Sequence, residues 1–227
     1  MEQKRCLALK ITGKAFDEGP ELLRKYVHVI GGLARDYSVL IVTGGGRVAR
    51  EYIEVLRKVG VESNYWLDIT GIWVSRLNAL TLIAALSPHS YPKPVTSIEE
   101  AVAAINTSRV VVAGGLIPGQ STASVLLQIA EALGLKKVYY YSAVGKVYDK
   151  DPLKYPNAKA LSVVRASELA KILEQEMLPG EYALIDLQAL KIAIRSGIEV
   201  QVLSYREPEQ IYEALKGGNP GTLILPE

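Results

Sequence analysis

The segment Ile41-Val42-Thr43-Gly44-Gly45-Gly46-Arg47 places three glycines between a short apolar run and a predicted helix that begins near Val48. A second glycine turn, Gly114-Gly115, follows the apolar run Val111-Val112-Ala113 and precedes Pro118-Gly119-Gln120-Ser121-Thr122. Glycine has no Cβ, so its backbone amides can approach a ligand closely. A helix that starts just beyond offers unpaired N–H groups and a positive dipole end to an anion. Two such turns indicate two anionic ligands, and two neighbouring phosphates indicate phosphoryl transfer.

Strand-like and helix-like segments alternate along almost the whole chain, which predicts an α/β fold. The pattern implies right-handed βαβ crossovers and a three-layer αβα sandwich around a mostly parallel central sheet. Ligands of such sheets bind beyond the carboxyl ends of the strands, where both glycine turns fall. The predicted strands are Arg5–Ile11, Ser38–Val42, Arg109–Ala113, Lys137–Ser142, Glu199–Leu203 and Thr222–Leu225. The predicted helices are Pro20–Tyr37, Val48–Val59, a long helix capped by Asp68 that runs to about Leu86, Glu99–Asn106 with a capping-box pattern at Ser97, Gln120–Leu133, a helix capped by Ser167 that runs to about Glu176, Tyr182–Ser196 and Pro208–Lys216.

Composition bounds the class of protein. The 227 residues are 49% hydrophobic, which predicts a large core, and we expect residues 1–227 to form a single domain. The net charge of +2 argues against a dedicated nucleic-acid surface. The single cysteine, Cys6, excludes an intramolecular disulfide and a Cys-rich metal site, and the two histidines, His28 and His89, give little support to a His-based one. No apolar run appears long enough for a membrane span and no signal peptide is evident, so we expect a cytoplasmic protein that binds no membrane.

The first glycine turn has alternative interpretations. Gly44, Gly46 and Ala49 match the dinucleotide-binding pattern G-x-G-x-x-A. That fingerprint is expected after the first strand of a chain, with an acidic residue at the end of the next strand. Here the turn follows the second predicted strand, and Asp68 is expected to begin a helix. A dinucleotide site and a purely structural tight turn both remain open.

Lysine and acidic residues supply further candidates. Lys10 interrupts an apolar strand and is followed by Thr12-Gly13-Lys14, so it can reach into the crevice at the carboxyl edge of the sheet. The alternative is a solvated lysine at the sheet edge, and for Lys14 simple exposure in a loop. The segment Val144–Pro152 carries a tyrosine and two aspartates that suit an adenine ring and a Mg²⁺-phosphate neighbourhood, or it is an ordinary turn-rich loop.

Five segments in register resemble one family across essentially the whole chain. They are Lys10-x-Thr12-Gly13-Lys14; Thr43-Gly44-Gly45-Gly46 with Ala49-Arg50; Asp68-Ile69-Thr70-Gly71-Ile72; Gly114-Gly115-x-x-Pro118-Gly119-x-Ser121-Thr122; and Val147-Tyr148-x-x-Asp151-Pro152. Their order is similar to that of the uridylate kinases of the amino-acid-kinase superfamily. The segment Gly71-Ile72-Trp73-Val74-Ser75-Arg76-Leu77-Asn78-Ala79 resembles the archaeal branch.

The resemblance implies an amino-acid-kinase-like fold and transfer of the γ-phosphoryl group of Mg-ATP to UMP, giving UDP for pyrimidine nucleotide biosynthesis. It places the UMP site mainly in the N-terminal half and the ATP site mainly in the C-terminal half. It implies ATP contacts at Lys10, Ile11, Thr12, Gly13, Lys14, Gly45, Arg50, Ser142, Tyr148 and Asp151. It implies UMP contacts at Gly44, Asp68 (ribose), Leu116, Ile117, Pro118, Gly119, Gln120, Ser121 and Thr122 (uracil). Lys10, Lys14 and Asp186 are the implied catalytic residues, although Asp186 is equally well interpreted as a solvated or capping carboxylate inside a helix.

The family also implies Mg²⁺ as a companion of ATP rather than a protein-held metal, a homohexamer built from dimers, and feedback by UTP. The chain departs from the family at Ser142-Ala143-Val144-Gly145-Lys146-Val147-Tyr148, where the usual sequence is Thr-Asn-Val-Asp-Gly-Val-Tyr. Lys146 either supplies charge to a phosphate or points into water. Two other functions stay open: another small-molecule kinase of the same fold, acting on a carboxylate, carbamate or isoprenoid phosphate, and a non-catalytic nucleotide-binding regulator.

Overall fold

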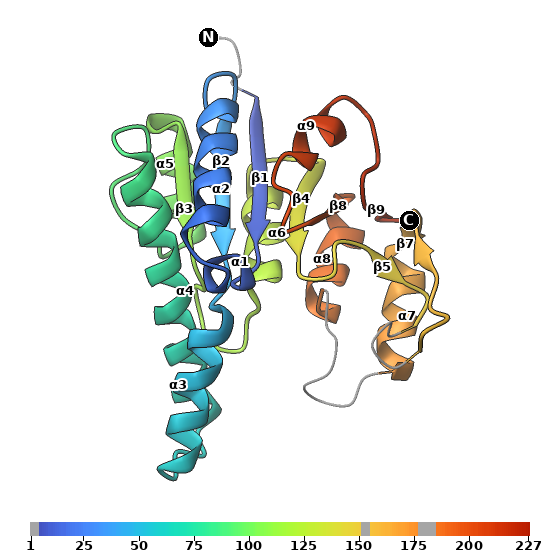
Figure 1. The fold of residues 1–227 in the computed structure, drawn as a ribbon, viewed down its shortest axis with the longest axis horizontal. Coiled ribbons are helices and arrows are strands. Elements are labelled where there is room, and N and C mark those ends of the chain that lie inside the picture. Colours follow the sequence, from blue (N-terminus) through green and yellow to red (C-terminus); the bar gives the residue numbers. More distant parts are fainter. Residues whose placement is uncertain (1–4, 151–154, 177–184) are drawn as a thin grey trace.

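A seven-stranded sheet runs through the molecule in the order β3-β2-β1-β4-β8-β9-β7 (Figure 1). The computed structural model describes residues 5–150, 155–176 and 185–227. Within this seven-stranded sheet, neighbouring strands are parallel except for β8 and β9, which are antiparallel. The strands are β1 (Cys6–Ile11), β2 (Ser38–Thr43), β3 (Val110–Ala113), β4 (Lys137–Ser142), β7 (Val163–Arg165), β8 (Glu199–Ser204) and β9 (Thr222–Leu225), and β5 (Val147–Tyr148) pairs separately with β6 (Ala160–Leu161).

Helices cover both faces of the sheet, which confirms the predicted three layers (Figure 1). On one face, α2 (Pro20–Leu33), the carboxyl-terminal half of α4 (Asn64–Leu86) and α9 (Gln210–Leu215) share a core with Leu9 and Tyr141. On the other, α5 (Ile98–Thr107), α6 (Thr122–Ala132), α7 (Ala166–Glu176) and α8 (Leu187–Ser196) share a core with Ala8 and Val138. Successive residues of β1 alternate between these cores because side chains of a strand point to opposite faces.

Two helices extend past the carboxyl ends of β2 and β3. α3 (Gly46–Lys58) and the amino-terminal half of α4 lie side by side and project beyond the body of the molecule (Figure 1). α4 begins at Asn64, after Ser63, so the prediction that Asp68 caps this helix was wrong. The helix starts a full turn earlier, and the Asp68 carboxylate instead accepts a hydrogen bond from the backbone of Gly119.

α4 also corrects the expectation that no apolar run reaches the length of a membrane span. It has 23 residues and is apolar enough to cross a membrane by length and composition alone. Yet Ala79, Leu82 and Ile83 in its carboxyl-terminal half are buried against the sheet. This half of the apolar helix is part of the core of the fold.

Several other elements also differ from the sequence predictions. α7 begins at Ala166, so Ser167 lies inside the helix rather than capping it. α8 begins at Leu187, and Asp186 is its N-cap; residues 182–184 of the predicted helix lie outside the described residues. A short helix α1 (Lys14–Asp17) follows β1. Cys6 is partly buried, and burial raises the pKa of its thiol to about 11.

Candidate active site

The turn after β1 packs directly against the turn after β2. A Cβ on Gly13 would lie 1.9 Å from the backbone nitrogen of Gly46, so only glycine allows the two backbones to meet. The Gly44 N–H donates to the Ile11 carbonyl at 3.0 Å. β1 has β2 and β3 on one side and β4 on the other, so these turns lie where the direction of strand order reverses. Ligands of open α/β sheets bind at this point.

Lys10 stands at the same edge, near the carboxyl end of β1. Its residue surface is only 6% exposed, and its ammonium nitrogen lies 4.3 Å from the centre of the Tyr140 ring. Within residues 5–150, 155–176 and 185–227, Lys10 has no carboxylate within ion-pair distance. A buried cation is costly unless it is paired, so this position favours an anionic ligand. Lys14, the first residue of α1, is exposed.

A pocket of about 190 Å³ lies between α3, α4 and the turn that joins β3 to α6. It gathers residues that the sequence placed in the candidate site: Gly45, Asp68, Ile117, Gln120 and Thr122. Gly45, which the resemblance assigns to ATP, lines this pocket together with residues assigned to UMP. The remaining lining residues are Gly46, Ala49, Ile53, Leu67, Gly71, Ile72, Ser75 and Gly115.

The wall formed by the β3–α6 turn is held by specific hydrogen bonds. Asp68 accepts from the Gly119 N–H at 2.8 Å, joining α4 to the turn. Ser121 caps α6 by accepting from the Ser124 N–H at 3.0 Å. Thr122, the first residue of α6, lines the pocket, and the dipole at the N-terminal end of a helix favours an anion. Leu116 and Pro118 of the same turn are partly buried.

Asp186 links the starts of two helices. It caps α8 by accepting from the Ala189 N–H at 3.0 Å, and it accepts from the Ser124 hydroxyl at 3.2 Å. Ser121 also donates its hydroxyl to the second oxygen of Asp186. Asp186 is therefore a capping carboxylate, and it stands at the start of the helix rather than inside it. The carboxylate orients α6 and α8 relative to one another.

Ser142, one of the predicted ATP-nucleoside residues, is the last residue of β4, which lies on the other side of β1 from β2. Ser142 is buried, and its hydroxyl accepts from the backbone N–H groups of Val144 and Gly145 at 3.1 and 3.2 Å. Tyr148 is partly buried in β5, and Lys146 is exposed. Asp151 lies outside the described residues. Arg50 is exposed on α3 and does not line the pocket described above.

Sequence reasoning gave no role to several residues at this site. Ser75 lines the pocket, and its neighbours Arg76 and Asn78 bond to the two glycine turns. The available signal was the segment Gly71–Ala79, which marked the family but carried no assigned chemistry. Polar residues in an apolar helix would have identified them.

The amino acid kinase family model matches residues 5–204, and the chain belongs to this family. It is 53% identical over 220 residues to a uridylate kinase of Staphylothermus marinus, covering 97% of this chain and 98% of the relative. It is 43% identical over 218 residues to a uridylate kinase of Pyrobaculum calidifontis, covering 96% and 99%. The crystal structure of uridylate kinase from Archaeoglobus fulgidus has a TM-score of 0.86 at 33% identity and covers 98% of this chain and all of that one. The UMP kinase of Bacillus anthracis shares the fold, with a TM-score of 0.81 at 20% identity and coverage of 99% and 96%. The resemblance read from the motifs is confirmed.

Proposed function

We propose that this protein is a UMP kinase that transfers the γ-phosphoryl group of Mg-ATP to UMP, giving ADP and UDP. The chain is similar to two uridylate kinases over nearly their whole length, at 53% and 43% identity. The structural observation that carries the proposal is the packing of the Gly13 turn on the Gly46 turn. This contact joins the turn that follows Lys10 to Gly46, which lines the pocket together with Asp68 and Thr122. A phosphate donor and a phosphate acceptor then meet at one edge of the sheet.

In the proposed arrangement, residues 1–227 act as one domain, with UMP mainly in the N-terminal half and ATP mainly in the C-terminal half. UMP occupies the pocket between α4 and the β3–α6 turn. Asp68 holds the ribose and Thr122 lies near the uracil. The backbone of Gly44 and the turn from Leu116 to Ser121 surround the nucleotide.

ATP binds across β1 from UMP in this proposal. The turn from Lys10 to Lys14 lines its phosphates, with Gly45 and Arg50 on the acceptor side. Ser142, Tyr148 and Asp151 contact the nucleoside. Asp186 acts through Ser121, whose hydroxyl it binds, and so serves as a positioning residue.

The reaction breaks the bond between the γ-phosphorus and the bridging oxygen of ATP and forms one to an oxygen of the UMP phosphate. A phosphate monoester has a second pKa near ~6, so UMP is mostly dianionic at neutral pH and needs no general base. The obstacle is repulsion: two groups of charge about −2, roughly 4 Å apart, repel by about 16 kcal/mol at an effective dielectric near 20. Lys10, Lys14 and Arg50, with the oriented amides of the turns, offset this repulsion in a loose transition state.

Magnesium enters this scheme with the substrate. Among the described residues, no three His, Cys, Asp or Glu side chains are grouped to hold a metal ion. We therefore expect the phosphates of ATP to hold Mg²⁺, with water completing its shell. The ion adds positive charge between donor and acceptor when it is bound.

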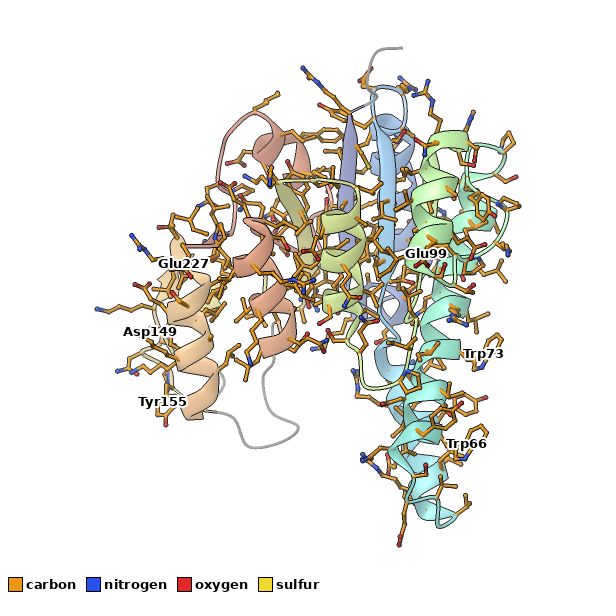
Figure 2. The ribbon with its side chains drawn as sticks, turned by 180° about the vertical axis from the view of Figure 1, so that it is seen from behind. Trp66, Trp73, Glu99, Asp149, Tyr155 and Glu227 are labelled. Atoms are coloured by element: carbon orange, nitrogen blue, oxygen red, sulfur yellow. The ribbon has the colours of Figure 1, made fainter. Side chains whose placement is uncertain are left out.

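We further propose that the protein works in the cytoplasm as a homohexamer built from dimers and that UTP inhibits it. An apolar stripe on α4, made by Trp66, Trp73, Leu77 and Leu80, supports the assembly. All four side chains are exposed, and their spacing places them on one face of the helix. Trp66 and Trp73 point away from the sheet (Figure 2). Exposed apolar surface of this kind marks a protein interface.

An acceptor panel tests the proposed function. ADP release is measured with Mg-ATP and, in turn, UMP, CMP, carbamate and isopentenyl phosphate. We expect turnover with UMP to exceed that with the other acceptors by a large factor. If another acceptor is turned over faster, that acceptor and not UMP is the substrate. Tight UMP binding without turnover would indicate a non-catalytic regulator.

A further inference from the structure

The segment Ser75-Arg76-Leu77-Asn78 carries three polar side chains into the apolar helix α4. Leu77 faces outward, whereas Ser75 is buried and Arg76 and Asn78 are partly buried. Burying a polar side chain is costly unless it forms hydrogen bonds. The partners of these three side chains therefore show what this part of the helix does.

Ser75 and Arg76 hold the turn after β3. The Ser75 hydroxyl accepts from the Gly115 N–H at 2.8 Å. The Arg76 guanidinium group donates to the Gly115 carbonyl at 3.0 Å and to the Leu116 carbonyl at 3.2 Å. Helix and turn are in direct contact, because a Cβ on Gly114 would lie 2.6 Å from the Ser75 hydroxyl. Ser75 and Arg76 thus form hydrogen bonds with three backbone groups of the turn between β3 and α6.

Asn78 holds the turn after β2. Its side-chain N–H donates to the Gly44 carbonyl at 2.8 Å. The hydroxyl of Thr43, the residue before Gly44 and the last of β2, donates to the Ser75 carbonyl at 2.8 Å. Backbone groups at such turns have left the sheet and need partners elsewhere. For both glycine turns, α4 supplies them.

We infer that Arg76 and Asn78 are positioning residues. Together with Ser75 they fix the two glycine turns to a single helix, and they thereby hold the UMP pocket against the turn that follows Lys10. The inference rests on the proposed function and adds to it two residues with separable effects. Among the described residues, the hydrogen bonds of the Arg76 side chain go to the turn that lines the UMP pocket. Asn78 bonds to the turn that also contacts Gly13 on the ATP side.

The Arg76→Ala variant should affect UMP rather than ATP. Two carbonyl groups lose their charged partner, so we expect KM for UMP to rise about tenfold while KM for ATP stays within about twofold. Arg76→Lys should give an intermediate value because an ammonium group cannot reproduce the planar fork. Added guanidinium ion should restore UMP affinity in Arg76→Ala. Arg57→Ala, which removes an exposed guanidinium group from α3, is the matched control.

The Asn78→Ala variant should instead lower kcat. Loosening the Gly44 carbonyl disturbs the alignment of the two phosphates, and misalignment of this kind slows the chemical step by roughly tenfold to a hundredfold. Both KM values should change little. Asn106→Ala is the control, since the exposed Asn106 amide donates to the Val102 carbonyl within its own helix.

Hydrogen exchange separates this inference from the proposed function. Arg76→Ala should speed amide exchange in residues 114–122 and leave residues 6–11 unchanged, whether or not wild-type protein phosphorylates UMP. If the wild type has no UMP kinase activity, the proposed function fails while this readout still tests the positioning role. Unchanged exchange at 114–122, faster exchange across all segments, or equal changes in the two KM values would overturn the inference.

Discussion

Lys10 combines burial with a charge that the described part of the protein does not pair. Its stem lies within β1, and its ammonium group stands over the Tyr140 ring. A cation over an aromatic face gains some energy, but far less than the cost of removing the charge from water. A phosphate oxygen at this position would supply the missing partner. The positive charge of Lys10 would then offset part of the repulsion between this phosphate and the second one.

We predict that Lys10→Met lowers kcat about 100-fold or more, since one preorganised cation is removed from the transition state. Methionine keeps an unbranched apolar stem beside Tyr140, so the fold should survive. KM for UMP should change little, and Lys25→Ala on the exposed side of α2 should behave as wild type. Steady-state kinetics with both substrates varied measure the effect; an unchanged kcat would remove Lys10 from the mechanism.

Two aspartates show how far local sequence predicts a site. Asp68 was expected to cap a helix because its residue type suits that position, but the bond that engages it comes from Gly119, 51 residues away. Asp186 was expected inside a helix or near the phosphates, and it caps α8 while binding two serines of α6. The sequence was sufficient to single out both carboxylates as candidate site residues. Their partners are set by tertiary packing, which no local pattern contains.

Local sequence patterns predicted most helix ends and strand positions correctly. Ser97 caps α5 by accepting from the Glu100 N–H at 3.1 Å, as its spacing predicts. Gly197 ends α8 in the left-handed conformation, with φ of 61°. All six strands expected from the sequence are present within a residue or so of their predicted ends. The start of α4 was missed because Ser63 makes no side-chain cap bond and gives no distinctive signal.

The α5 cap gives a prediction about pH. The Lys93 ammonium group and the Thr96 N–H lower the pKa of Glu100 from 4.5 to about 2. A depressed carboxyl pKa stabilises the folded state above the unfolded pKa, and this contribution is lost as pH falls through the folded value. Glu100→Gln should therefore cost about 1 kcal/mol at neutral pH, because solvent screens the exposed Lys93.

Urea unfolding at neutral pH and at steps between pH 4.5 and 2 measures this difference. The gap between wild type and Glu100→Gln should narrow steadily as pH falls through this range. Glu62→Gln, in the exposed loop before α4, is the control. A gap that stays constant with pH would show that the charge of Glu100 contributes nothing.

For the whole molecule, the projecting pair α3 and α4 presents apolar side chains that the described chain does not cover. Leu77 is 59% exposed and Trp73 is 65% exposed. Leu77→Glu should weaken the proposed assembly, because a charge at the centre of an apolar contact must be desolvated. Val163→Glu, at an exposed valine of β7, is the control.

Light scattering on a sizing column compares the mass of each variant with multiples of the 24.7 kDa chain. We expect wild type and Val163→Glu to share one oligomeric mass and Leu77→Glu to shift to a smaller species. A wild-type mass of one chain, or a Leu77→Glu mass equal to wild type, would exclude this face as the interface.

The most direct test is a crystal structure of the protein with UMP and a non-hydrolysable Mg-ATP analogue bound together. We expect the UMP phosphate in the pocket between Gly45 and Thr122 and the γ-phosphate beside Lys10. The attacking oxygen and the γ-phosphorus should lie about 3–3.5 Å apart, the spacing of a near-attack complex. Nucleotides bound in unconnected pockets, or phosphates facing away from one another, would contradict it.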